Sequence, residues 1–102
     1  MGKADVIENI KRFSVELSKQ IKFKKIILFG SFARGTANAD SDIDVAIIVD
    51  KFPGDFLKTT PLLWRIASEI DSRIEPVIIE EGNDDSGFLE SITKYGETIN
   101  TL

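Results

Sequence analysis

The chain has 102 residues, of which 42% are hydrophobic, so we expect a single domain, residues 1–102, with one modest core. It contains no run of 18 apolar residues, and its first residues lack the apolar core of a signal peptide, so we expect no membrane span and a cytoplasmic location. The absence of cysteine excludes disulfides and thiolate zinc sites. Because histidine is absent too, a general base at neutral pH would be a carboxylate, a lysine or the substrate itself.

The net charge of −4 is unevenly distributed. Residues 1–25 contain seven Lys or Arg and three acidic residues, whereas residues 26–102 contain six and fourteen. A solvated helix face accounts for the basic segment. The acidic remainder argues against extended binding to a nucleic-acid backbone, which needs clustered positive charge.

The N-terminal half of the chain predicts one helix and two strands. Apolar residues recur every three or four positions over residues 4–21, which is typical of an amphipathic helix. Residues 25–29 form a short apolar run that ends at a glycine and predict a strand. Residues 35–41, rich in Gly, Thr, Asn, Asp and Ser, predict a loop, and a second strand follows over residues 42–50.

The C-terminal half predicts a helix over residues 57–72, a strand over 74–80 and a short last helix that ends at Gly96. Pro76 would remove one hydrogen-bond donor from the third strand, so we expect it at a sheet edge or at the strand's start. The element order is therefore α-β-β-α-β-α. It predicts an α+β fold, in which helices cover a small mixed sheet of about three strands.

Two aspartates open the second predicted strand. Because side chains alternate along a strand, Asp42 and Asp44 project from one face, about 7 Å apart at their roots. Two carboxylates this close repel each other unless a cation lies between them. Oxygen ligands favour Mg²⁺, with Mn²⁺ as the other candidate, over zinc. The alternative is a pair of acids at a strand entrance, one of which caps the preceding loop.

A glycine-rich turn connects the first strand to the loop. Gly30 and Ser31 follow the strand directly, and Arg34 and Gly35 come three residues later. Backbone N–H groups and a hydroxyl in such a turn can bind phosphate, and Arg34 is a candidate contact for a triphosphate. The alternatives are turn glycines where the backbone needs positive φ, and an arginine that is solvated beside acids. The turn and the aspartates together predict metal-assisted chemistry on a nucleoside triphosphate.

Residues 30–44, Gly-Ser-Phe-Ala-Arg-Gly-Thr-Ala-Asn-Ala-Asp-Ser-Asp-Ile-Asp, resemble the signature of the DNA polymerase beta-like nucleotidyltransferase superfamily. That signature is a Gly-Ser turn followed by Asp-x-Asp, and the spacing most resembles the minimal nucleotidyltransferase branch. The resemblance is dense over residues 26–50 and follows the element order over residues 5–95. It implies the palm-like fold of polymerase beta and an Mg²⁺-dependent transfer of a nucleoside monophosphate, above all AMP from ATP, to a hydroxyl acceptor.

The resemblance also assigns roles to individual residues. It implies that Asp42 and Asp44 bind both catalytic cations and that the turn binds the triphosphate. The family usually has a third carboxylate on a later strand, and Glu75 is the first candidate for this catalytic and metal-binding position. A solvent-facing edge residue is the alternative for Glu75. Asp71, near the end of the preceding helix, is its rival.

The resemblance further implies a protein partner. Minimal nucleotidyltransferases are commonly encoded beside a helical HEPN-domain protein, often a toxic ribonuclease, so the chain is expected to act as an antitoxin. Either a HEPN-domain protein or a homo-oligomer would complete the acceptor site, and Trp64, otherwise expected in the core, is a candidate for that surface. Two alternatives remain: an inactive partner-binding module and a transferase that modifies a small molecule such as an antibiotic. The sequence leaves the acceptor, the base preference and the oligomeric state open.

Overall fold

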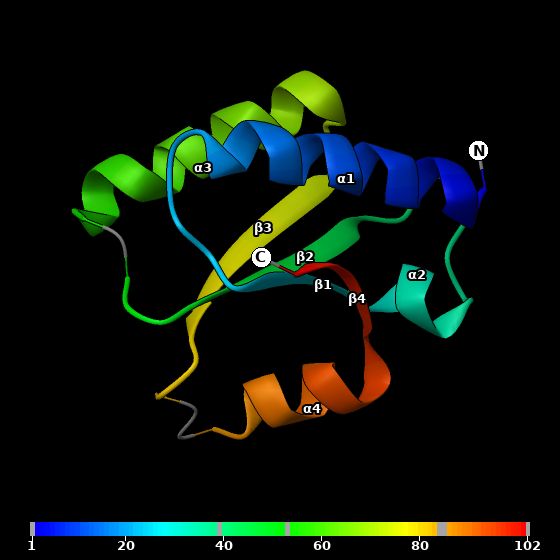
Figure 1. Cartoon of the computed structure of the whole chain (residues 1–102). Coiled ribbons are helices and arrows are strands. Elements are labelled where there is room, and N and C mark those ends of the chain that lie inside the picture. Colours follow the sequence, from blue (N-terminus) through cyan, green and yellow to red (C-terminus); the bar gives the residue numbers. More distant parts are fainter. Residues whose placement is uncertain (1, 39, 53, 84–85, 102) are drawn as a thin grey trace.

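The computed structural model describes residues 2–38, 40–52, 54–83 and 86–101, so Ala39 of the predicted 35–41 loop lies outside the described residues. Helices and strands alternate along the chain, which confirms the predicted α+β class (Figure 1). In chain order the elements are α1 (Lys3–Ser18), β1 (Lys25–Phe29), α2 (Ser31–Arg34), β2 (Ile43–Val49), α3 (Phe56–Ile70), β3 (Ile74–Glu80), α4 (Phe88–Tyr95) and β4 (Glu97–Thr101).

The strands form one mixed sheet in the order β3-β2-β1-β4. β1 pairs antiparallel with β2 and β4, whereas β2 and β3 are parallel. Because β3 is an edge strand, Pro76 can be accommodated there, as predicted. The pairing also brings three chain segments together at one end of the sheet: the end of β1 and the starts of β2 and β3.

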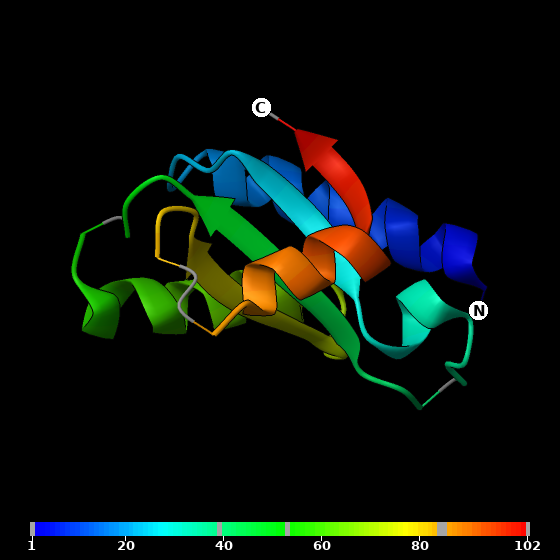
Figure 2. The ribbon, with the colours of Figure 1, turned by 90° about the horizontal axis from the view of Figure 1, so that it is seen from below.

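Helices cover the two faces of the sheet unequally. α1 and α3 lie side by side over one face, and the shorter α4 lies on the other (Figures 1 and 2). The larger core packs α1 and α3 onto the sheet and includes every second residue of β2: Ile43, Val45, Ile47 and Val49. The smaller core packs side chains of α4 and β1 against the intervening β2 residues: Leu89, Ile92, Ile27, Ala46 and Ile48.

The predicted count of three strands is wrong, because the sheet has four. The additional strand, β4, pairs with β1, with Glu97 opposite Leu28 and Thr98 opposite Ile27. Its sequence, Glu-Thr-Ile-Asn-Thr, is mostly polar and shows no alternation of several apolar residues. Backbone hydrogen bonds to β1 position such an edge strand, and these leave little trace in a hydrophobic pattern.

One helix boundary and one additional short helix also differ from the prediction. α1 ends at Ser18 and not near residue 21, because the backbone N–H groups of Gln20 and Ile21 both donate to the carbonyl of Leu17 and close the helix with a turn. The four-residue helix α2, which follows Gly30, was not predicted. A segment this short carries no helical periodicity in its sequence.

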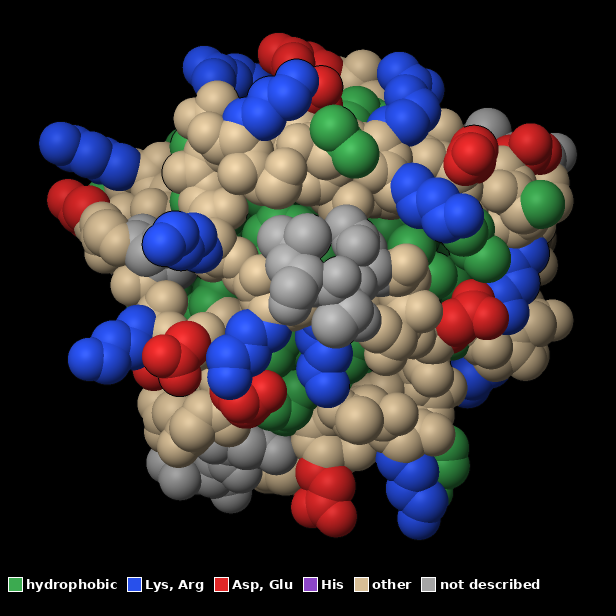
Figure 3. Space-filling view, viewed as in Figure 1, with side chains coloured by type: hydrophobic (Ala, Val, Ile, Leu, Met, Phe, Trp, Pro, Cys, Tyr) green, Lys and Arg blue, Asp and Glu red, His purple; other side chains and the backbone are tan. Residues whose placement is uncertain are grey.

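The surface combines charges of both signs. Figure 3 shows Lys and Arg side chains interspersed with Asp and Glu across the whole view, from the α1 and α3 layer at the top to α4 at the bottom, with no single sign dominating. Trp64 is 45% exposed, so the prediction that it belongs to the core is wrong. Within the described part of the chain, no helix has the length and apolar character needed to span a bilayer.

Candidate functional site

Asp44 and Glu75 come together from two neighbouring strands. Asp44 is the second residue of β2 and pairs in register with Glu75, the second residue of β3. Directly paired residues on adjacent strands point to the same face of a sheet, so both carboxylates lie on the α4 side. Asp42 directly precedes β2, and alternation along the chain places it on that side as well. The parallel pairing thus joins the three predicted acids.

Gly30, at the end of β1, lies against the Asp44 carboxylate. Phe29, the residue before it, pairs with Asp44 on β2, so the turn begins directly beside the carboxylate. A methyl group added to Gly30 would collide with the Asp44 Oδ2 atom and would lie 3.1 Å from its Cγ atom. Gly30 also has φ of +75°, a conformation that L side chains rarely adopt. Both the backbone conformation and the close approach of Asp44 therefore require glycine at this position.

The pKa values of the acids show that they interact. Burial raises the pKa of Asp44 above its usual value, the charge of Asp42 raises it further, and Arg34 opposes both effects. Partial removal from water also raises the pKa of Glu75, followed by the charges of Asp42 and Asp44 and by hydrogen bonding with them. Ionising the whole cluster is therefore unfavourable, and a nearby cation would relieve that cost.

The chemistry of these donors fits a hard divalent cation. Carboxylate oxygens are the ligands that Mg²⁺ and Mn²⁺ prefer, and Asp42, Asp44 and Glu75 supply them from one face of the sheet. As they stand, no three Asp, Glu, His or Cys side chains among the described residues are arranged to hold a metal ion. Asp44 is half-buried and Glu75 is exposed, so both side chains have room to change rotamer when a cation binds.

The predicted phosphate turn leads into α2. Gly30 is the residue that precedes this short helix, and Gly35, with φ of +75°, ends it. The carbonyl of Ser31 accepts the backbone N–H of Thr36 at 3.0 Å, so the turn folds back on itself. Because the charge of Arg34 lowers the pKa of Asp44, its guanidinium lies within electrostatic reach of the acids. Gly30 therefore lies against Asp44 and Arg34 within electrostatic range of it, while Ser31 and Gly35 belong to the same turn and short helix.

Asp71, the rival to Glu75, has other partners. Its carboxylate accepts hydrogen bonds from the Arg73 side chain at 2.8 and 3.1 Å and from the Asn9 side chain at 3.2 Å. Hydrogen bonding to Arg73 lowers the pKa of Asp71, which is the opposite shift from that of Glu75. The structure thus brings Glu75, and not Asp71, to the paired aspartates. Sequence reasoning overlooked Arg73, and the Asp-x-Arg spacing was the signal that could have identified it.

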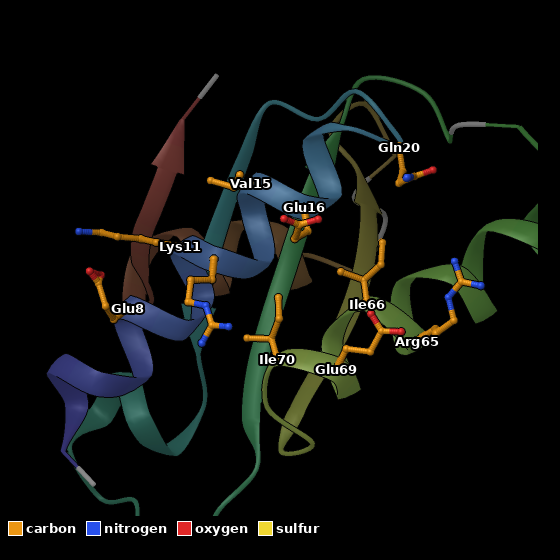
Figure 4. Close-up of a pocket in the computed structure, with 10 residues that line it drawn as sticks. Glu8, Lys11, Val15, Glu16, Gln20, Arg65, Ile66, Glu69 and Ile70 are labelled. Atoms are coloured by element: carbon orange, nitrogen blue, oxygen red, sulfur yellow. The ribbon is translucent and has the colours of Figure 1, made fainter.

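A separate groove of about 760 Å³ lies between α1 and α3 (Figure 4). Its lining includes Lys11 and Glu16 of α1 and Arg65 and Glu69 of α3. Both helices cover the sheet face opposite to the carboxylates, so this groove is not part of the site described above. Opposite charges alternate along it, in contrast to the acidic cluster on the α4 side.

Comparison with known proteins supplies a family match. The family model described as "Nucleotidyltransferase domain" matches residues 7–97. A Methanocaldococcus jannaschii protein named "Putative protein adenylyltransferase MJ0141" is 37% identical over 101 residues, which covers 93% of this chain and 99% of that protein. The matched segments include the turn, both aspartates and the strand that carries Glu75.

Solved structures share the fold. A Sulfolobus solfataricus nucleotidyltransferase structure superposes with a TM-score of 0.70 and 17% identity, over 94% of this chain and 80% of that one. A structure described as "Crystal structure of the toxin-antitoxin with AMP-PNP" also has a TM-score of 0.70, with 24% identity over 94% of this chain and 73% of that one. At these identities the likeness concerns the fold alone.

Proposed function

This chain belongs to the nucleotidyltransferase domain family, and we propose that it transfers AMP from ATP to a hydroxyl acceptor. In the proposed reaction the acceptor oxygen forms a bond to the α-phosphorus, and the bond from that phosphorus to the bridging oxygen breaks. Pyrophosphate leaves with the electron pair of that bond, and the acceptor proton passes to a base. Such transfers depend on in-line positioning and on charge neutralisation more than on covalent help from the protein.

One observation carries this proposal: Glu75 pairs in register with Asp44 and shares its electrostatic environment with Asp42 and Asp44. The three carboxylates would hold divalent cations, Mg²⁺ or Mn²⁺. When bound, these cations neutralise charge on the attacking and leaving oxygens. Asp42 and Asp44 would contribute to both metal positions, and Glu75 would complete one of them.

The remaining residues have roles that follow from their places around the acids. Gly30 and Ser31 would bind the β- and γ-phosphates through backbone N–H groups and the Ser31 hydroxyl. Arg34 and Gly35 lie at the far end of α2, where Arg34 would add positive charge beside the triphosphate. Glu75 is the candidate base, because its raised pKa brings it closer to the range in which a carboxylate can accept a proton efficiently.

We propose a protein partner as well, in the first place a HEPN-domain toxin that this chain would neutralise. Two observations support it. The structure with a similar fold described as a toxin-antitoxin with AMP-PNP combines a toxin and an antitoxin with an ATP analogue. In addition, Val77 on β3 and Phe88 at the start of α4 are 41% and 42% exposed on the α4 side, which leaves apolar surface for a partner near the acids. A homo-oligomer is the other way to cover this surface.

The test is transfer of label from α-³²P-ATP with Mg²⁺, in the presence of the protein that co-purifies with this chain. Mass spectrometry of that protein should show an added AMP on a hydroxyl side chain, and the modification should be abolished in Asp42→Asn/Asp44→Asn. If wild-type protein transfers no label to the partner or to small hydroxyl acceptors, the enzymatic proposal fails and an inactive binding module takes its place.

A further inference from the structure

A partly buried ion pair lies between the end of α3 and the start of β3, next to the strand that carries Glu75. Asp71, which ends α3, and Arg73, which precedes β3, have side chains that are 8% and 19% exposed. The Arg73 Nε and Nη2 atoms donate to the two carboxylate oxygens at 3.1 and 2.8 Å, and the Arg73 backbone N–H donates to Oδ1 at 3.0 Å. Asn9 of α1 donates to Oδ2 at 3.2 Å. The orientation of the guanidinium plane is thus fixed by a two-pronged interaction.

Arg73 in turn touches both halves of the site. Its guanidinium carbon lies 5.7 Å from the centroid of the Phe32 ring, and Phe32 is the second residue of α2, directly after Ser31. Phe32 is buried in the larger core, so packing restricts its ring and, through it, the residue next to Ser31 in the turn. The backbone carbonyl of Arg73 accepts the N–H of Ile43 at 2.8 Å, and Ile43 lies between Asp42 and Asp44. One residue therefore connects the phosphate turn to the acidic strand.

We infer that Arg73, oriented by Asp71, is a positioning residue that sets the place of the phosphate turn relative to Asp42 and Asp44; this inference rests on the proposed function. The carbonyl of Arg73 holds the start of β2 whatever its side chain is, whereas only the side chain reaches Phe32. A change in the side chain should therefore displace the turn and leave the acids in place. Lysine cannot replace arginine here, because it lacks the planar fork and stacks less well on an aromatic ring.

Arg73→Lys and Asp71→Asn are the informative variants. We expect each to weaken AMP-PNP binding, measured by calorimetry with Mn²⁺, by about tenfold, because each weakens the cation–π interaction with Phe32 together with the ion pair that orients it. The KM for ATP should rise in parallel while kcat changes little, since a displaced phosphate turn affects ground-state binding. Binding of Mn²⁺ alone should stay at the wild-type level, a result that a general loosening of the fold would not give.

Arg65→Ala is the matched control, because it removes an arginine from the α1–α3 groove on the opposite face of the sheet. It should leave AMP-PNP and Mn²⁺ binding unchanged. Phe32→Leu keeps an apolar side chain but removes the ring, so adding it to Arg73→Lys should weaken AMP-PNP binding less than the sum of the two single effects.

The outcomes separate the two proposals. Wild-type AMP-PNP affinity in Arg73→Lys, or an equal decrease in Mn²⁺ affinity, would overturn the positioning role. If wild-type protein binds AMP-PNP but transfers no AMP, the proposed function fails while the binding measurements still decide the positioning role. If wild-type protein does not bind AMP-PNP at all, both proposals are rejected.

Discussion

The two faces of the sheet differ in what covers them. α1 and α3 bury one face completely at its centre, where Ile43, Val45 and Ile47 have no exposed surface. The eight-residue α4 buries only part of the other face. The acids and Val77 lie beyond it, and Phe88, its own first residue, is 42% exposed. β2 belongs to both faces, because its successive residues point alternately to the two sides.

The difference shows how one strand can serve both stability and function. Charged carboxylates on the α1 and α3 side would be almost completely removed from water, at a cost of several kcal/mol for each unpaired ion. On the α4 side, at the end of the sheet, Asp44 keeps partial exposure and Asp42 and Glu75 are exposed. Partial burial and, after it, the repulsion between the acids raise the pKa of Asp44 and Glu75 without preventing folding.

The largest expected effect separates function from stability at the α4 side. Asp42→Asn/Asp44→Asn should abolish MgATP binding and slow AMP transfer by at least about a hundredfold, because charge at the reaction centre is no longer neutralised. Without metal, Asp44→Asn should melt at the wild-type temperature or above it, since one repelling charge is gone. Calorimetry and thermal melts with a chelator check both. A marked fall in melting temperature would mean that Asp44 has a structural role.

The second prediction distinguishes Glu75 from its neighbours. Glu75→Gln should bind MgATP with nearly wild-type affinity but slow transfer by about a hundredfold or more, because it acts mainly in the transition state. Asp71→Asn, by contrast, should change KM and leave kcat nearly unchanged. Steady-state kinetics with labelled ATP measures the two constants. A wild-type kcat in Glu75→Gln together with a strongly reduced kcat in Asp71→Asn would make Asp71 the third carboxylate.

The opposite face should respond in the opposite way. Ile47→Ala should lower the free energy of unfolding by about 2–5 kcal/mol, since it opens a cavity where the side chain is fully buried. The folded fraction should still bind MgATP with unchanged affinity. Val77→Ala, on the exposed side of β3, is the control and should change stability by less than about 0.5 kcal/mol. Urea denaturation provides both values, and equal decreases in the two variants would refute the contrast between the faces.

The smallest expected effect is on the pH dependence of stability, which should have one sign for Asp44 and Glu75 and the opposite sign for Asp71. The pKa values of Asp44 and Glu75 are higher in the folded state than in the unfolded state, where they are about 4. The free energy of unfolding of the metal-free protein should therefore decrease as the pH rises from about 4 through the folded-state values. Asp71, with a lowered pKa, contributes stability that is present above about pH 4 and is lost as pH falls through its folded-state value.

Thermal melts with a chelator between pH 3 and pH 7 would measure these contributions. Asp44→Asn should reduce the loss of stability at the upper end of the range, and Asp71→Asn should reduce the loss at the lower end. Melting curves of both variants that run parallel to the wild-type curve would contradict the pKa shifts.

Much of the fold could be predicted because its elements carry local periodicity. The strands over residues 25–29 and 74–80 and the last helix ending before Gly96 agree with the prediction. β4 was not predicted because a polar edge strand is positioned by backbone hydrogen bonds to its neighbour. α2 was not predicted because four residues are too few to show a helical periodicity. Trp64 lies on a helix whose apolar stripe is clear, but the sequence does not say which residues beside that stripe remain exposed.

The candidate site was likewise predictable only where it depends on residues close together in the sequence. The sequence by itself determined that Asp42 and Asp44 share a face and that a Gly-Ser turn precedes them, because alternation and turn chemistry act over a few residues. Only the tertiary structure placed Glu75 beside Asp44 and set Gly30 against the Asp44 carboxylate. The first contact depends on the parallel pairing of β2 and β3 across an intervening helix, and the second on the antiparallel pairing of β1 and β2. The meeting of such segments is decided by packing of the whole chain.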